Sequence, residues 1–277
     1  MVNVLDDIIG ELETKLKEMD MWDNTVLVLT SDNGGPTDPT ETGATNYDLR
    51  GGKNSDWEGG VRAAAFMTGG YLPTERRGVT IKEPIHITDW YTTFPTLAGV
   101  EMKPLGDDED PTMPHIDAVD VWPLIIGEVD LSPRQEIPLS WSSLILGDYK
   151  LIWEDSVSNA GWSGKNYPDA STLSSDVFDA TSNCTTGCLF NVADDRSEKY
   201  DLASENPLRL QAMKLRLYEL REEFFMNNDE FTEDSCPDDI DMECACWIAI
   251  NHYGGFLGPF ANLEDFERLN SSVTSTS

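Results

Sequence analysis

The first hundred residues alternate between helix-like and strand-like hydrophobic patterns. Apolar residues from Val2 to Met19 recur every three or four positions, which predicts an amphipathic helix. Unbroken apolar runs at Thr25 to Thr30 and at Ala63 to Met67 predict two fully buried strands. A second helix is expected from Thr88 or Asp89 to Gly99. Helices and buried strands in this order predict an α/β layer, in which ligands gather at the carboxyl ends of the strands.

Beyond residue 130 the pattern changes to shorter pieces with strand character. These fall at Ile137 to Trp141, Ser143 to Leu146, Tyr149 to Trp153 and Leu189 to Val192, and a long helix is expected to follow from Asn206. The stretch 156–186 is rich in Ser, Asn and Gly and is interpreted as an insertion. We therefore predict part of an α/β core over 1–130 and a small α+β domain, an antiparallel sheet covered by one helix, over 131–277.

The charge of the chain excludes several partners. Its 277 residues carry 51 acids and 19 Lys plus Arg, a net charge of -32, so nucleic acid and anionic membrane surfaces should be repelled. The acids concentrate at 106–110 and 229–243, which are interpreted as solvated loops, with weak calcium binding as the alternative. No apolar run reaches the roughly twenty residues that a membrane span needs.

Five cysteines fall into two groups, Cys184 with Cys188 and Cys236 with Cys244 and Cys246. Disulfides are favoured over a zinc site, because neither group has paired Cys-x-x-Cys spacing. Asn183 and Asn270 begin Asn-x-Ser/Thr triplets and are candidate glycosylation sites. Together these features favour a secretory route for the full-length parent protein, which would end in a lysosome, a vacuole or the extracellular space. No signal peptide is recognisable, and the first helix starts without a cap, so we expect a segment upstream.

One polar corner stands out directly after the first buried strand. Asp32 and Asn33 offer a carboxylate and an amide oxygen, which are hard donors suited to Ca²⁺ or Mg²⁺, and two glycines follow. The alternative interpretation is a plain turn, since all four residues are turn formers. Lys53 and Arg50, with Arg62, form a basic patch that could hold the oxygens of a sulfate or phosphate. Taken singly, each of these cations is also a common surface residue.

At these residues the sequence resembles the type I sulfatases, and is most similar to the arylsulfatase B (N-acetylgalactosamine-4-sulfatase) group. The resemblance rests on three stretches: Leu29-Thr30-Ser31-Asp32-Asn33-Gly34-Gly35, Leu49-Arg50-Gly51-Gly52-Lys53 and Trp57-Glu58-Gly59-Gly60-Val61-Arg62. Later motifs follow in the usual order of the family: Ile85 to Trp90, Asp117 to Trp122, Ser132 to Arg134, Gly147 to Leu151 and Leu189 to Val192.

The resemblance implies the C-terminal part of an alkaline-phosphatase-like core followed by a small antiparallel domain. It also implies Ca²⁺ held partly by Asp32 and Asn33, a sulfate contact from Lys53, and a sulfated sugar as the substrate. The nucleophile of the family is a formylglycine made from a cysteine in Cys-x-Pro-Ser-Arg. None of the five cysteines stands in such a motif, so the nucleophile, the first metal ligands and the catalytic histidines are expected in an N-terminal half.

We therefore expect the C-terminal half of a calcium-dependent sulfatase that is inactive alone. His86, His115 and His252 do not match catalytic positions and are interpreted as structural or surface residues. One alternative is a metal-dependent phosphodiesterase or phosphatase of the same superfold, which Asn33 and Lys53 disfavour. The other is a non-catalytic calcium-binding or interaction protein derived from a sulfatase.

Overall fold

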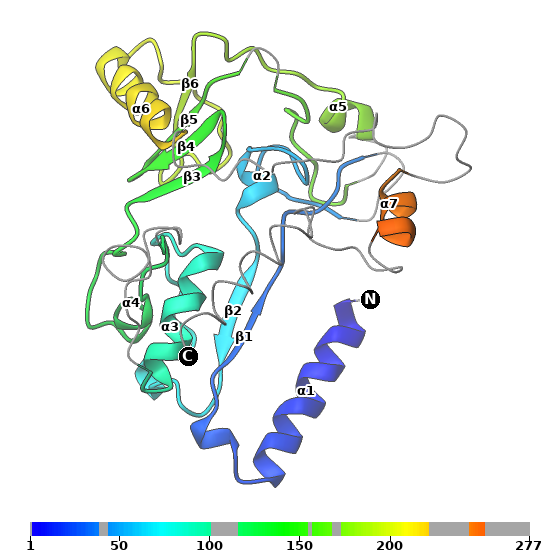
Figure 1. Ribbon diagram of the computed structural model, residues 1–277, viewed down its shortest axis with the longest axis vertical. Helices are drawn as coiled ribbons and strands as arrows, with labels where there is room; N and C mark the ends of the chain where they lie inside the picture. The colour runs from blue at the N-terminus through cyan, green and yellow to red at the C-terminus, as the bar shows by residue number, and fades with distance from the viewer. Residues whose placement is uncertain are drawn as a thin grey trace, which may run out of the picture. The chain divides into compact units, whose positions relative to one another are not determined.

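Figure 1 shows the computed structural model, which describes residues 2–38, 44–100, 116–154, 157–167, 173–221 and 244–252. The chain divides into two compact units, Met1–Glu222 and Glu223–Ser277. Helix α7 (Cys244–His252) is the described element of the second unit. The other elements belong to the first unit, which contains two sheets, one on each side of the predicted division at residue 130.

The first helix forms as the hydrophobic pattern predicts, but its apolar face is exposed. Helix α1 spans Val2–Glu18 and contains no buried residue. Two ion pairs along its polar side, Lys15 with Glu18 and Lys17 with Glu13, support the helix locally. A 3-10 turn, η1 (Trp22–Asn24), then leads into the first strand.

The prediction that the first two strands are fully buried is wrong. β1 (Leu27–Thr30) and β2 (Ala65–Thr68) pair antiparallel, with Leu27 opposite Thr68, as a two-stranded sheet. No residue of either strand is buried, and Phe66 is 45% exposed. Burial of both faces requires covering layers, and none of the described elements provides them for this sheet.

A small core lies beyond β2. Leu72, Val121 and Ile125 pack together, with Trp90 and Ile85 against them. The elements around this core are η2 (Thr74–Arg76), η3 (Ile87–Asp89), α3 (Trp90–Leu97) and α4 (Trp122–Ile126). The expected second helix is thus present as η3 and α3, and Gly99, just past α3, has a positive φ of 74°.

A buried ion pair connects this core to the second half of the unit. The Arg134 guanidinium donates from Nε to both carboxylate oxygens of Asp89, at 2.8 and 2.9 Å. Arg134 and Asp89 are 6% and 0% exposed at their side chains. The same guanidinium donates to the backbone carbonyl of Asp117, so it joins η3 to two later stretches of chain.

The second sheet confirms the predicted antiparallel sheet under one helix. The strands β3 (Glu136–Ser140), β4 (Ser143–Leu146), β5 (Tyr149–Ile152) and β6 (Cys188–Asn191) pair in that order, each antiparallel to the next. Helix α6 (Pro207–Leu220) contacts β4 and β5. A short helix, α5 (Ser174–Phe178), lies in the predicted insertion.

The loop before β2 packs into the core of this second sheet through one buried side chain. Trp57, directly before α2 (Glu58–Val61), is fully buried and meets Phe190 of β6 edge to face at 5.8 Å. Ile152 of β5 and Val157 belong to the same cluster. Figure 1 shows α2 between the β1–β2 pair and the second sheet. The two sheets are therefore joined through the segment that carries the candidate site.

Candidate functional site

The Asp-Asn-Gly-Gly corner follows β1 and packs against the turn that contains α2. The Gly34 N–H donates to the Gly60 carbonyl at 2.8 Å. A Cβ on Gly34 would lie 1.6 Å from the Gly59 carbonyl oxygen, a distance that no side chain tolerates. Glycine at position 34 is thus required by close backbone contact, which fixes the corner next to the Trp57–Gly60 turn.

The side chains of Asp32 and Asn33 are arranged as oxygen donors. Asn33 Nδ2 donates to the Gly34 carbonyl at 2.6 Å, whereas its Oδ1 accepts no hydrogen bond from the described residues. Asp32 is exposed, and its carboxylate makes no hydrogen bond or ion pair within the described ranges. A carboxylate and an amide oxygen are therefore both available on adjacent residues.

The loop that carries Lys53 lies directly against this corner. The Lys53 N–H donates to the Gly35 carbonyl at 3.1 Å, so the corner and the loop share a backbone hydrogen bond. The Lys53 carbonyl in turn accepts from Asn159 Nδ2 at 3.2 Å. The structure thus brings together the loops of Asp32, Asn33 and Lys53.

Arg50 belongs to the scaffold of the site. Its guanidinium carbon lies 3.7 Å from the ring centroid of Trp57 and 4.5 Å from that of Trp162, and the residue is 9% exposed. Arg50 Nε donates to the Ala160 carbonyl at 2.7 Å. Burial lowers the pKa of Arg50, against the opposing charge of Glu198. Its described contacts are to backbone carbonyls and to two aromatic rings, so Arg50 supports the Lys53 loop, and a contact of Arg50 with sulfate stays a prediction.

The segment 157–167 supports the site loops, a role that the sequence did not reveal. Thr37 Oγ1 donates to Asn159 Oδ1 at 2.7 Å, and the Tyr167 hydroxyl donates to the Thr37 carbonyl at 2.7 Å. The Gly51 N–H donates to the Gly161 carbonyl at 2.8 Å. The Ser- and Gly-rich composition of this stretch, which is interpreted as an insertion from the sequence, belongs in the structure to a segment that contacts the site loops through backbone groups.

A buried ion-pair network fixes α2 to the second sheet. Lys150 Nζ of β5 lies 3.0 Å from Glu58 Oε1 and 2.9 Å from Glu198 Oε1. The Glu58 N–H donates to Glu198 Oε2 at 2.7 Å, and Arg62 reaches Glu58 Oε2 at 3.2 Å. Burial raises the pKa of Glu198; it would lower that of Lys150, but the two carboxylates outweigh it, so the pKa of Lys150 is raised as well. Lys150 is therefore held as a cation.

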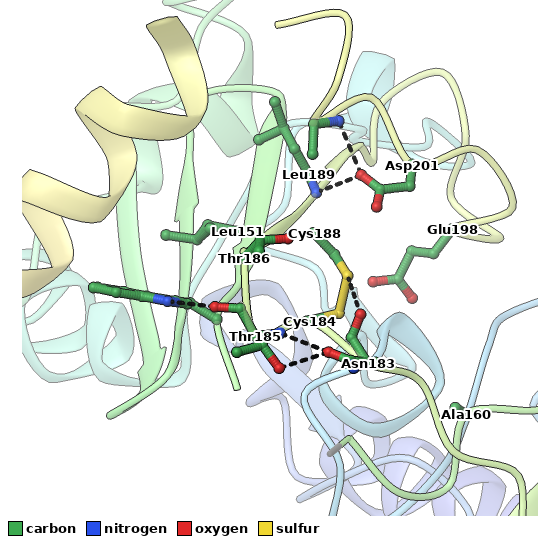
Figure 2. Close-up of a disulfide and its surroundings, with 12 residues drawn as sticks. Leu151, Ala160, Asn183, Cys184, Thr185, Thr186, Cys188, Leu189, Glu198 and Asp201 are labelled. Atoms are coloured by element: carbon green, nitrogen blue, oxygen red, sulfur yellow. Dashed lines mark hydrogen bonds between the residues drawn. A yellow bond between two sulfur atoms is a disulfide. The ribbon is translucent and has the colours of Figure 1, made fainter. Parts of the chain in front are cut away.

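Cys184 and Cys188 form a disulfide at the edge of the second sheet, which confirms the preference for a disulfide over zinc at this pair (Figure 2). Cys246 is a free, exposed thiol. Within the described residues there is no group of three or more His, Cys, Asp or Glu side chains that could hold a metal ion. Cys236, His115 and Asn270, and the side chains of Cys244 and His252, lie outside what the structure describes.

Asn183 is exposed at the turn that leads into this disulfide. Its Oδ1 accepts from the backbone N–H of Thr185 at 3.0 Å and from the Thr185 hydroxyl at 2.6 Å (Figure 2).

His86 caps η3, with Nδ1 2.8 Å from Thr88 Oγ1, and burial together with the charge of Arg134 lowers the pKa of His86. Among the described helices, none combines the length and the hydropathy needed to cross a membrane.

The sequence is similar to several known sulfatases. It is 31% identical to mouse arylsulfatase J over 242 residues, which cover 78% of this chain and 38% of that protein. It is 29% identical to human arylsulfatase A over 221 residues, covering 76% and 40%. It is 32% identical to rat steryl-sulfatase over 142 residues, covering 48% and 22%. The similarity to the arylsulfatase B group in particular stays a prediction.

The fold is also similar to those of two solved structures, one of which is a sulfatase. The PsFucS1 sulfatase from Pseudoalteromonas sp. superposes with a TM-score of 0.57 at 26% identity, over 79% of this chain and 42% of that one. Ps i-CgsB in complex with k-i-k-neocarrahexaose superposes with a TM-score of 0.60 at 23% identity, over 92% and 48%. The chain thus spans less than half the length of each of these relatives.

The family model described as Sulfatase matches residues 1–100. This range contains the Asp32–Gly35 corner, the Lys53 loop and α2. The match agrees with the relatives and with the fold similarity, and we conclude that this chain belongs to the sulfatase family.

Proposed function

We propose that this chain carries the calcium-binding and sulfate-contacting part of a sulfuric ester hydrolase that acts on a sulfated sugar. One observation carries the proposal: the Gly35 carbonyl accepts the Lys53 N–H at 3.1 Å, so an oxygen-rich corner and a cationic loop meet at one hydrogen bond. A metal ion and a fixed cation are the groups that stabilise negative charge on the oxygens of a tetrahedral anion.

The residues of the corner fit calcium by their chemistry. Asp32 offers two carboxylate oxygens, and Asn33 offers Oδ1 because its Nδ2 is committed to the Gly34 carbonyl. Calcium takes six to eight oxygen ligands, so these two residues provide part of a shell that other ligands must complete. Calcium bound there would polarise the oxygens of the sulfate group.

The roles of this chain in the reaction follow from its own residues. Asp32 and Asn33 bind the ion, and Lys53 is the charge offered to the sulfate oxygens. Arg50, stacked between Trp57 and Trp162, keeps the Lys53 loop in place. No Cys-x-Pro-Ser-Arg motif is present in the 277 residues, so we propose that the formylglycine nucleophile comes from another segment and that this chain alone hydrolyses no sulfate ester.

The substrate and the compartment are proposed on chemical grounds. A net charge of -32 repels long polyanions, which favours small or terminal sulfate esters over polymers. A full enzyme with this chain should gain activity on a sulfated polymer as salt rises, because screening weakens that repulsion. The Cys184–Cys188 disulfide and the exposed Asn183 support a secretory route, since disulfides persist in oxidising compartments.

The test is calcium binding by the purified chain, measured by isothermal titration calorimetry. Asp32→Asn and Asn33→Ala should weaken binding at least about tenfold, since each removes an oxygen donor or its charge. Asp130→Asn is the matched control, because Asp130 is exposed and remote in sequence from the corner. Equal affinity in all four proteins would assign the binding to other acidic stretches and refute the proposed site.

A second assay addresses catalysis. The purified chain is incubated with calcium and an aryl sulfate, and we expect no turnover. Measurable hydrolysis that disappears in Lys53→Met would refute the requirement for another segment while supporting the site. If calcium binds at Asp32 but a longer protein that includes this chain also hydrolyses no sulfate ester, the non-catalytic binding function would be the correct one.

A further inference from the structure

The Asn46 side chain pairs with the backbone of the residue that ends the corner. Asn46 Oδ1 accepts the Gly35 N–H at 2.8 Å, and Asn46 Nδ2 donates to the Gly35 carbonyl at 2.9 Å. One primary amide thus meets both polar groups of a single residue, as a neighbouring strand would. The position of Gly35 is fixed by this side chain.

The same amide also holds the loop of Lys53. Asn46 Nδ2 donates to the Gly51 carbonyl at 3.0 Å, two residues before Lys53. The Gly35 carbonyl that Asn46 contacts is the one that accepts the Lys53 N–H. Asn46 Nδ2 therefore donates one hydrogen to the corner and the other to the Lys53 loop, and the Gly35 carbonyl also accepts the Lys53 N–H.

The glycines around Asn46 leave room for its amide. A Cβ on Gly52 would lie 2.8 Å from Asn46 Nδ2, and one on Gly35 would lie 3.1 Å from Asn46 Oδ1. The Asn46 backbone is anchored from the other side, where its N–H donates to Ser163 Oγ at 3.2 Å. The amide is thus enclosed by two glycine-containing loops and fixed by the 157–167 segment.

We propose that Asn46 is a positioning residue that sets the spacing between the Asp32–Asn33 metal corner and Lys53. The proposal rests on the proposed function, because it assumes that calcium and Lys53 hold the same sulfate group. Aspartate has the shape of asparagine but no N–H donors, so at position 46 it would direct a carboxylate oxygen at the Gly35 and Gly51 carbonyls. It would push the two loops apart while both ligand groups stay in the chain.

The measurement is the coupling between calcium and sulfate. Calcium affinity is determined by calorimetry with and without saturating sodium sulfate at constant ionic strength, for the wild-type chain, Asn46→Asp, Lys53→Met and the control Asn3→Asp. An anion that bridges the ion and Lys53 should raise calcium affinity about tenfold in the wild type and in Asn3→Asp, which is a typical size for coupled sites. In Asn46→Asp and Lys53→Met this factor should fall below about twofold, with calcium affinity alone changing little in Asn46→Asp.

The outcomes separate this inference from the proposed function. The role of Asn46 would be refuted if Asn46→Asp kept the coupling factor of the wild type while Lys53→Met lost the coupling. That result would leave the proposed site intact. Absence of Asp32-dependent calcium binding, or of sulfate coupling in the wild type, would overturn both. If Asn46→Asp does not fold, Asn46→Ala takes its place, since it removes the bridge without adding charge. A general loss of stability would weaken calcium binding itself and would not remove the coupling selectively.

Discussion

The buried cation at the centre of the ion-pair network gives the sharpest test of how the two sheets are joined. Lys150 is 0% exposed at its side chain and lies between Glu58 and Glu198, which are 4% and 0% exposed. Lys150→Met keeps most of the length and apolar volume of the side chain but removes the charge. Two buried carboxylates then remain, of which Glu58 keeps its ion pair with Arg62, a residue that is 43% exposed.

The expected cost is large because one partner is removed from a buried network. Breaking such a pair costs about 3–5 kcal/mol, because the remaining charge is left uncompensated. Glu198 Oε1 already accepts no hydrogen bond from described residues and depends on Lys150 for its partner charge. A domain is stable by about 5–15 kcal/mol, so Lys150→Met should remove at least about a fifth of the total.

The assay is urea unfolding followed by tryptophan fluorescence, at pH 7.5 and at pH 4.5. The exposed neighbour Lys199→Met serves as the control and should change the free energy of unfolding by less than about 0.5 kcal/mol. Combining Lys150→Met with Glu198→Gln should recover about 1 kcal/mol or more, because the pair is coupled.

The pH dependence has a definite sign. Burial raises the pKa of Glu198 above its ordinary 4.5, so the folded state binds more protons than the unfolded state above that pH. Stability then falls as the pH rises, and without Lys150 this fall becomes steeper, so the deficit of Lys150→Met should be larger at pH 7.5. A loss below about 1 kcal/mol, or strict additivity with Glu198→Gln, would refute the reasoning.

Three further predictions concern other features. Gly34→Ala should destabilise the chain by at least about 1–3 kcal/mol, because the new Cβ would meet the Gly59 carbonyl. Gly10→Ala in the exposed helix α1, where a Cβ would have nothing within 4 Å, should instead stabilise the chain by about 0.5–1 kcal/mol. Equal effects of the two substitutions in thermal unfolding would contradict the packing argument. Replacing both Cys184 and Cys188 by Ala should cost about 2 kcal/mol in urea unfolding, the loop entropy for a separation of 4 residues, and an unchanged midpoint would show that the bond constrains nothing. The lowered pKa of His86 means that the unfolded state takes up the proton first, so stability should fall as the pH drops below 6.5, and His86→Gln should flatten that slope; an identical slope in both proteins would argue against it.

The sequence predicts local elements well because their signals are local. Helix α1, the β3–β5 strands and helix α6 follow directly from periodicity and turns such as Gly147, whose φ is 57°. The corner and the Lys53 loop were found because acid, amide, cation and glycine occur together in short motifs. The hydrogen bond between the Lys53 N–H and the Gly35 carbonyl, which joins the corner to the loop, could not be predicted from these motifs because it depends on the fold.

What could not be predicted depends on residues far apart in the chain. Unbroken apolar runs predict buried strands at β1 and β2, yet burial depends on the layers around a sheet, which the hydrophobic pattern alone does not determine. Lys150 stands in the Gly147–Leu151 motif, but no hydrophobic pattern distinguishes it from a surface cation, and only its contacts with Glu58 and Glu198 explain its burial. The charge of Arg50 predicts a substrate contact, but its stacking on the rings of Trp57 and Trp162 depends on the fold.

The bracing of the site by the 157–167 segment has a consequence for biosynthesis. Arg50 donates to the carbonyl of Ala160, 110 residues later, and to that of Glu198, 148 residues later. A ribosome that adds roughly 5–20 residues per second takes about 6–22 s to make the first of these partners. During that interval the site loops have been synthesised but cannot close, and Trp57 lacks its neighbours in β5 and β6. The nascent chain should therefore present this tryptophan and the Arg50 loop to chaperones until the second sheet has emerged.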